Sequence, residues 1–347
     1  MGCVTIVGTF LSRPVIAKHL LGITKNWGGT SMSRFIAFSV IFICLELALV
    51  TFFQTSAKAS ENQRDRANQK PTKPKPTYKD VAYGSHERNV LDLWLAESEY
   101  PSPLVMFIHG GGFTGGSKEA LNANTLRELL DAGISVAALN YRLMAHAPLP
   151  AAHYDCRQAL QFLRSKAKEW NIDKTRVGAF GGSAGAQICM WLAFHDEMAV
   201  PESSDPAKQE STRLTCVATN GGQTTMDMNW WKKWIPGYES SHRNFFETFG
   251  VQTQEEYLKK VAEVSALSLI SEDDPPIFMT YRMAPDDPVP DDPQKARGWK
   301  VHHVMFGVKL KEKMDELGIE ADLKYPGART TYRSVPHFFI KKLLTGK

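Results

Sequence analysis

The hydrophobic and polar positions from residue 90 onward follow two alternating patterns. Short apolar runs such as 104–108 are typical of strands buried on both faces of a sheet. Longer stretches such as 151–170 place apolar residues every three or four positions, which is typical of amphipathic helices. We expect strands at 90–95, 104–108, 134–139, 176–180, 215–219, 276–281 and 319–325, and helices at 121–132, 151–170, 183–195, 303–317 and from about 336. This alternation predicts an α/β fold with a mostly parallel central sheet and helices on both faces.

One segment departs from this rhythm. Residues 221–265 carry many aromatic side chains and show no strand alternation. They predict an insertion into the fold, acting either as a lid or as the wall of a substrate cleft. The alternative is that the aromatic residues only pack the insertion onto the sheet, and the pattern favours neither.

The N-terminal residues have the pattern of a secretory signal peptide. An apolar run at 35–53 follows Arg34, and the small residues of Ala57-Lys58-Ala59 come after it. We therefore expect a leader at 1–59 with its core at 32–59, starting at Met1 or at Met32, and export to the periplasm or the outside. The alternative is an uncleaved membrane anchor, because 19 residues nearly span a bilayer. Either way, membrane contact is expected only through this segment.

A polar segment rich in Lys, Gln and Pro at 60–79 predicts an extended linker, followed by a globular domain at 80–347. Outside the leader, acidic and basic residues are equal in number, so a basic footprint for nucleic acid is not expected. The sequence has no HExxH motif, no Cys/His cluster and no G-x-G-x-x-G motif, so neither a metal nor a cofactor is expected.

The sequence Gly181-Gly182-Ser183-Ala184-Gly185 matches G-x-S-x-G. A predicted strand leads into it and a predicted helix leads out, which is the context of a nucleophile elbow. Such an elbow forces the serine into a strained backbone conformation, so its neighbours must be small. This context predicts Ser183 as a nucleophile.

A second glycine-rich motif, His109-Gly110-Gly111-Gly112, follows the buried strand 104–108. Acyl transfer passes through an oxyanion, which is stabilised by backbone N–H donors that no side chain obstructs. We assign this oxyanion hole to the N–H groups of Gly111, Gly112 and Ala184. We expect His109 to fix the loop by hydrogen bonding.

From about residue 78 onward the chain resembles α/β-hydrolases of the hormone-sensitive-lipase-like and feruloyl- and acetyl-esterase-like groups. The residues that carry the resemblance are HGGGF at 109–113, NYRL at 140–143, PAAHYD at 150–155 and GGSAGA at 181–186. The resemblance implies an α/β-hydrolase fold and a catalytic triad in the chain order Ser, Asp, His.

The remaining triad members follow from this order. The family's D-x-x-V-P setting selects Asp286 as the acid, with Asp287 as the alternative. The histidine is expected after the last strand, which selects His337; His302 and His303 are alternatives that precede a helix and that strand.

We therefore expect an exported serine carboxylesterase that acts on a small-molecule or carbohydrate-linked ester, such as an acyl or feruloyl ester of a carbohydrate. One alternative is a serine peptidase related to prolyl oligopeptidases, although no propeller repeats precede the domain. Another is a non-catalytic binding module on the same fold, although every expected part of the site is present.

Overall fold

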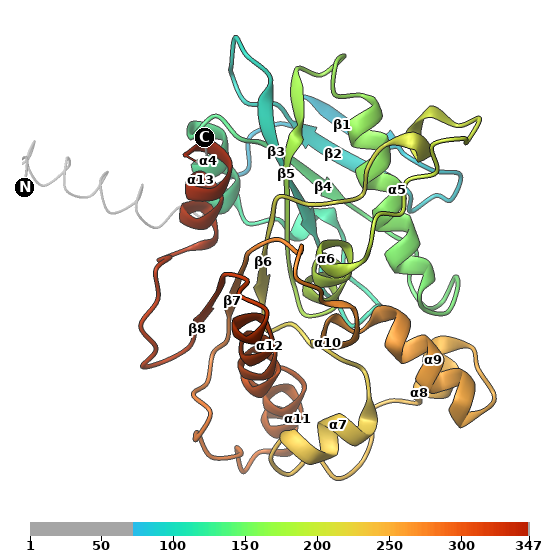
Figure 1. Cartoon of the computed structure of the whole chain (residues 1–347), viewed down its shortest axis with the longest axis vertical. Helices are drawn as coiled ribbons and strands as arrows, with labels where there is room; N and C mark the ends of the chain where they lie inside the picture. The colour runs from blue at the N-terminus through green and yellow to red at the C-terminus, as the bar shows by residue number, and fades with distance from the viewer. Residues whose placement is uncertain (1–71, 346–347) are drawn as a thin grey trace, which may run out of the picture. The chain divides into compact units, whose positions relative to one another are not determined.

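The computed structural model describes residues 72–345 (Figure 1). The predicted leader at 1–59 and the first part of the predicted linker lie outside these residues. None of the helices within 72–345 has the length and apolar character needed to cross a bilayer.

Eight strands form one sheet in the described residues, in the order β1-β2-β4-β3-β5-β6-β7-β8. In chain order they are Tyr78–Ala82, Val90–Trp94, Ser102–Ile108, Ser135–Leu139, Ile172–Gly182, Cys216–Asn220, Ile277–Thr280 and Ala321–Lys324. Strand β2 pairs antiparallel with β1 and β4, and every other pairing is parallel. The predicted α/β fold with a mostly parallel sheet is confirmed.

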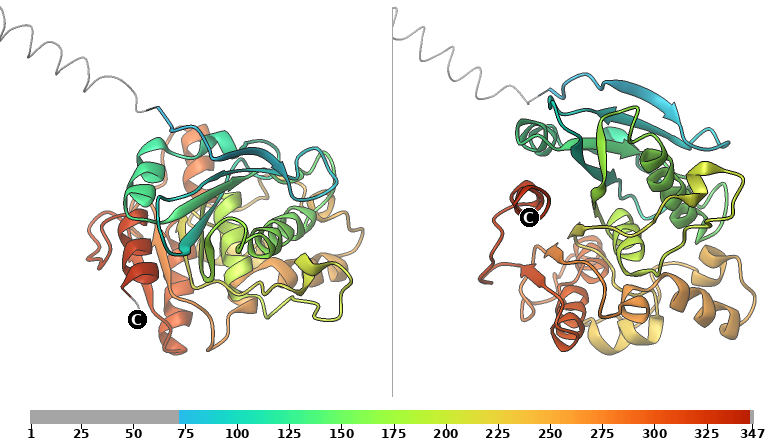
Figure 2. Two further views of the ribbon diagram at one scale, coloured as in Figure 1. Left: turned by 90° about the horizontal axis from the view of Figure 1, so that it is seen from above. Right: turned by 45° about the horizontal axis from the view of Figure 1, so that its top comes forward.

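Helices cover both faces of this sheet (Figures 1 and 2). On one face, α4 (Ala123–Asp131) and α13 (Val335–Leu344) pack against each other over Val105 and Phe180. On the other face lie α5 (Ala151–Ser165), α6 (Ala184–Phe194), α10 (Ala266–Leu269) and α12 (Met305–Glu316). Each face therefore has its own apolar core, and the carboxyl ends of the parallel strands remain available for a site.

The last residues of the predicted linker pack on the domain. Trp94 Nε1 donates to the carbonyl oxygen of Pro74, and the backbone N–H of Leu95 donates to the hydroxyl of Thr77. Residues 78–82 then form β1, which the sequence pattern did not predict. The folded domain therefore begins before residue 80.

The insertion at 221–265 is helical. It contains α7 (Met228–Trp234), α8 (Phe245–Phe249) and α9 (Gln254–Val264). Several of its aromatic residues are buried against one another, namely Trp231, Tyr238, Phe245, Phe249 and Tyr257. These aromatic residues are continuous with the apolar core on that face of the sheet, since Trp231 also packs on Phe306 of α12.

A further unpredicted helix, α11 (Pro293–Val301), precedes α12. The Asp292 side chain accepts a hydrogen bond from the backbone N–H of Lys295, and Pro293 occupies the first turn, as is common at helix starts. The chain is not helical between Val301 and Met305. His302 lies in this break.

Candidate active site

Ser183 occupies a sharp turn between β5 and α6. Its backbone has φ +52° and ψ −118°, a strained conformation for a residue with a side chain. A Cβ atom added at Gly181 or Gly185 would collide with the carbonyl oxygen of Ile108. The small residues on both sides therefore allow the turn, as the sequence predicted, and the turn exposes the Ser183 hydroxyl at the carboxyl end of the sheet.

His302 faces this hydroxyl. Its Nε2 lies 3.0 Å from Ser183 Oγ, and its Nδ1 lies 2.9 Å from the carbonyl oxygen of Gly298. A carbonyl oxygen only accepts hydrogen bonds, so Nδ1 carries the proton in the neutral ring. Nε2 is then free to accept the hydroxyl proton of Ser183, which is the arrangement of a nucleophile and its general base.

The structure does not bring His337 to Ser183. His337 lies in the first turn of α13, where its backbone N–H donates to the Ser334 hydroxyl and its Nδ1 accepts from the backbone N–H of Arg333. The Ser334 cap and Pro336 mark the start of this helix, which packs against α4. This placement corrects the sequence-based expectation, because the alternative His302 takes the position expected for His337.

The two candidate acids lie in the loop after β7. Asp287 lines the same cleft as Ser183 and His302, and its Oδ2 accepts a hydrogen bond from the backbone N–H of Ala284. Asp286 is exposed and does not line that cleft. Within residues 72–345, His302 Nδ1 is hydrogen-bonded to a backbone carbonyl and to neither carboxylate.

The glycine-rich loop after β3 lies close to Ser183, because a Cβ atom added at Gly110 would be 3.5 Å from the Cβ of Ser183. Gly111 and Gly112 have φ of +110° and +60°, and Gly112 and Ala184 line a small cavity at Ser183. Ala184 is the first residue of α6, so its N–H has no acceptor within the helix. The structure therefore places Gly112 and Ala184 at the cavity beside Ser183, whereas Gly111 lines neither cavity there.

His109 is buried beneath this loop. Arg88 Nη2 lies 3.3 Å from His109 Nε2, and His109 Nδ1 lies 2.7 Å from the carbonyl oxygen of Gly110. Its ring stacks on Tyr141 with the centroids 4.2 Å apart. Burial lowers the pKa of His109 to about 4, so the ring is neutral near pH 7. His109 therefore fixes the loop by hydrogen bonding.

Two cavities of very different size meet at Ser183. The larger has a volume of about 880 Å³ and is lined by His302, Asp287 and Trp299, among others. The smaller has a volume of about 20 Å³ and is lined by Gly112, Ala184 and buried side chains of the insertion, including Met226, Trp231 and Phe245. The insertion thus forms a wall of the site.

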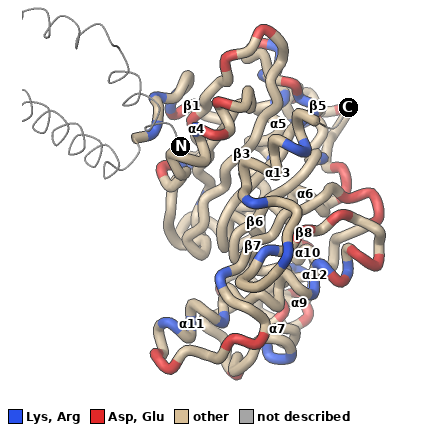
Figure 3. Tube along the Cα trace, turned by 90° about the vertical axis from the view of Figure 1, so that its left-hand side faces the viewer, with Lys and Arg blue, Asp and Glu red and all other residues tan. Residues whose placement is uncertain are grey.

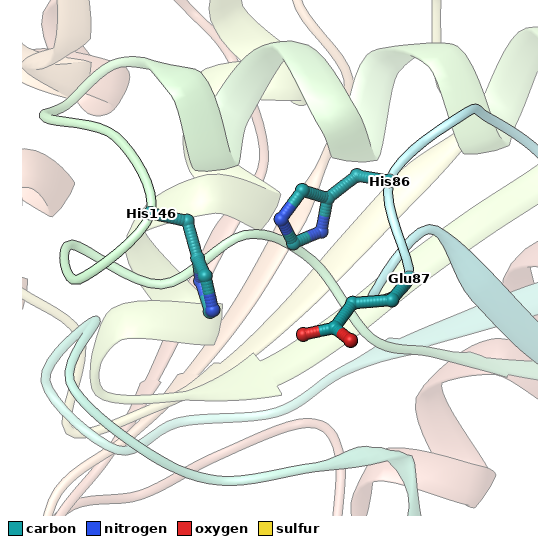
Figure 4. Close-up of side chains that lie close together, drawn as sticks. All are labelled: His86, Glu87 and His146. Atoms are coloured by element: carbon teal, nitrogen blue, oxygen red, sulfur yellow. The ribbon is translucent and has the colours of Figure 1, made fainter.

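Within the described residues, one group of side chains has the composition of a metal site. His86, Glu87 and His146 face a common space, with ligand atoms within 4.8 Å of one another (Figure 4). However, His86 Nδ1 accepts from the backbone N–H of Arg88, and His146 Nδ1 accepts from that of Leu143. In each neutral ring the proton then lies on Nε2, and the lone pair of Nδ1 already accepts a hydrogen bond. In this arrangement neither histidine offers a free lone pair to a metal. The group as it stands is a hydrogen-bonded surface cluster.

Figure 3 shows that the Lys and Arg positions are interspersed with the Asp and Glu positions along the backbone trace. Three cysteines of the described domain, Cys156, Cys189 and Cys216, are buried and free.

A family model, BD-FAE, matches residues 91–294. Among curated proteins, the chain is 32% identical over 124 residues to a probable isoprenylcysteine alpha-carbonyl methylesterase of Arabidopsis thaliana, covering 35% of this chain and 29% of that protein. It is 36% identical over 85 residues to an arylesterase of Saccharolobus solfataricus, covering 24% of this chain and 28% of that protein. The chain thus spans less than a third of the length of these two relatives.

Solved structures share the fold. A truncated carbohydrate esterase from gut microbiota has a TM-score of 0.58 at 20% identity, covering 74% of this chain and 90% of that one. A thermophilic esterase of Thermogutta terrifontis has a TM-score of 0.52 at 18% identity, covering 76% and 90%. At such identities the likeness shows the fold alone.

Proposed function

Because this chain belongs to the BD-FAE family, we propose that it is a carboxylic-ester hydrolase with Ser183 as nucleophile and His302 as general base. The observation that carries the proposal is the 3.0 Å contact between His302 Nε2 and Ser183 Oγ. The curated relatives named as esterases support the reaction class. The intact contact argues against a non-catalytic binding module.

In the proposed mechanism, Ser183 Oγ attacks the ester carbonyl while His302 Nε2 takes its proton. The N–H groups of Gly111, Gly112 and Ala184 donate to the oxyanion of the tetrahedral intermediate. His302 then gives the proton to the leaving alcohol, and a water molecule hydrolyses the acyl-enzyme by the same steps. The Gly298 carbonyl oxygen holds the tautomer of His302 through Nδ1.

The two cavities orient the ester. The leaving alcohol must lie where His302 can protonate it, and His302 lines the large cleft but not the small cavity. The alcohol therefore occupies the large cleft, and the acyl group occupies the small cavity. At about 20 Å³ the small cavity is far smaller than the large cleft of about 880 Å³, so we expect it to take only a short acyl group.

We therefore propose acetyl, or a similarly small acyl group, on a bulky alcohol as the substrate class. The large cleft offers the partly buried ring of Trp299 and the polar side chain of Asp287, a combination suited to a carbohydrate. A structural neighbour is titled a carbohydrate esterase, which agrees with this alcohol class. A feruloyl group is far larger than the small cavity, so we expect it to be a poor acyl group.

The test uses the full chain with a fluorophosphonate probe, followed by mass spectrometry of the labelled peptide. A panel of p-nitrophenyl acetate, butyrate and hexanoate with ethyl ferulate is assayed beside it. We expect labelling at Ser183 and turnover that falls steeply after acetate. Folded protein that is neither labelled nor active would refute the proposed function. Labelling with a preference for long or feruloyl esters would refute only the acyl assignment.

A further inference from the structure

Arg243 extends from the insertion to the glycine-rich loop. It lies between α7 and α8, and its Nη1 donates to the carbonyl oxygen of Gly112 over 3.0 Å. Its Nη2 lies so close that a Cβ atom at Gly112 would be only 3.2 Å from it. Arg243 also lines the small cavity with Ser183 and Ala184. A guanidinium group therefore contacts the loop that the proposed mechanism uses as its oxyanion hole.

The glycine-rich loop has to be held in its conformation by contacts from other parts of the domain. Phe113 directly follows Gly112 and has φ +64°, a left-handed conformation that is strained for a bulky side chain. Such strain persists only where surrounding contacts hold it in place. Two hydrogen bonds enclose the strained residue: Arg243 donates to the Gly112 carbonyl before it, and the backbone N–H of Met144 donates to the Phe113 carbonyl over 2.8 Å.

Arg243 is itself held by a chain of contacts within the insertion. Its Nε donates to His242 Nε2 over 3.2 Å, so the proton of the neutral His242 ring lies on Nδ1 and faces the Tyr238 hydroxyl at 2.7 Å. The His242 ring stacks on Trp231 with the centroids 5.1 Å apart. Burial, together with the positive charges of Arg243 and Arg297, lowers the pKa of His242 to about 4. The ring thus remains an acceptor near pH 7.

From these contacts we propose that Arg243 is a positioning residue of the oxyanion hole. Its hydrogen bond fixes the orientation of the peptide that joins Gly112 to Phe113, and thereby restrains ψ of Gly112, next to the peptide that carries the Gly112 N–H. Its positive charge beside the loop also favours the negative charge that develops there. The inference rests on the proposed function and extends it, because it makes the assembled hole depend on the insertion.

The experiment compares Arg243→Met with Arg297→Met. Arg297 is the control: it is a nearby but exposed arginine that donates to the carbonyl oxygen of His242 over 3.2 Å and does not line the small cavity. With p-nitrophenyl acetate we expect Arg243→Met to lower kcat about 100-fold with little change in KM, and to slow fluorophosphonate labelling similarly. We expect Arg297→Met to stay within about threefold of wild type.

Arg243→Lys keeps the positive charge but loses the planar guanidinium group with its several N–H donors. We therefore expect its activity to lie between those of wild type and Arg243→Met. Added guanidinium ion should partly restore Arg243→Ala, which a merely structural role would not allow. Wild-type kcat in Arg243→Met, equal losses in both Met variants, or an effect on KM alone would each overturn the inference.

A crystal structure of Arg243→Met separates this inference from the proposed function. If wild type shows no turnover, the esterase proposal fails by itself. A changed backbone at Gly112 and Phe113 in the variant would still support the positioning role, and an unchanged loop would overturn it.

Discussion

The imidazole of His302 lies 3.0 Å from the hydroxyl of Ser183, although 119 positions separate the two residues in the chain. The contact depends on the end of α11. His302 caps this helix, and its Nδ1 returns to the carbonyl oxygen of Gly298 one turn earlier. A local helix end, positioned beside the carboxyl ends of the strands, therefore directs the other ring nitrogen towards Ser183.

Alanine substitutions at His302 and at His337 should differ strongly in their effect on kcat. We expect His302→Ala to lower kcat for p-nitrophenyl acetate by at least about 1000-fold, because Ser183 then has no base. We expect His337→Ala to retain near-wild-type kcat, since His337 contacts Tyr332, Arg333 and Ser334 instead. Steady-state kinetics with circular dichroism as a folding control decide this. A large loss in a folded His337→Ala variant would contradict the assignment.

The sequence predicted the parts of the site that have local signals. Ser183 lies in a five-residue motif flanked by a buried strand and a helix, and the steric demands of that turn act within the motif itself. Gly111 and Gly112 also belong to a local motif, since the glycine-rich run begins two residues after β3 ends. The buried strands were found because a strand covered on both faces is apolar throughout.

The histidine depends on tertiary structure and was assigned by chain order. One local signal was present: Asp292-Pro293 has the form of a helix N-cap, which predicts a helix that begins there and precedes His302. Strand β1 was missed for a different reason. It is a sheet edge with mostly exposed residues, so its sequence YKDVA has no apolar pattern. The contact of Arg243 with Gly112 joins residues 131 positions apart and leaves no mark in the sequence.

Asp287 should contribute less to kcat than the aspartate of a complete Ser-His-Asp triad does. No carboxylate holds His302 Nδ1 in the described residues, so we expect Asp287→Asn to lower kcat about tenfold at most, through loss of negative charge in the cleft. The exposed Asp286→Asn is the matched control and should be neutral. A loss near 10⁴-fold in Asp287→Asn, as for a triad aspartate, would show instead that Asp287 is the direct partner of His302 during catalysis.

Two methionines test the orientation of the ester. Met226 lines only the small cavity and Met283 lines only the large cleft, and both are buried. We expect Met226→Ala to enlarge the acyl cavity and to raise kcat/KM for butyrate relative to acetate about tenfold. Met283→Ala should leave this ratio unchanged. The opposite pattern, measured with the p-nitrophenyl panel, would mean that the acyl group lies in the large cleft.

Buried His153 should make the fold sensitive to acid. Its ring lies between Phe113 and Trp191, and neither ring nitrogen has a hydrogen-bond partner within the described residues. Burial lowers its pKa from 6.5 to about 3, so the folded state prefers the neutral ring. The unfolded chain binds the extra proton first as the pH falls, and the stabilising contribution present above pH 6.5 is lost progressively towards pH 3.

For this group alone, the loss amounts to at most about 1.4 kcal/mol in the free energy of unfolding per pH unit. His153→Phe keeps an aromatic ring but removes the titrating group, so its free energy of unfolding should fall less steeply than that of wild type between pH 6.5 and 4.5. The exposed His146→Gln is the control and should follow wild type. Urea unfolding at several pH values measures the slopes. Equal slopes for wild type and His153→Phe would show that His153 does not titrate between the folded and unfolded states as its burial implies.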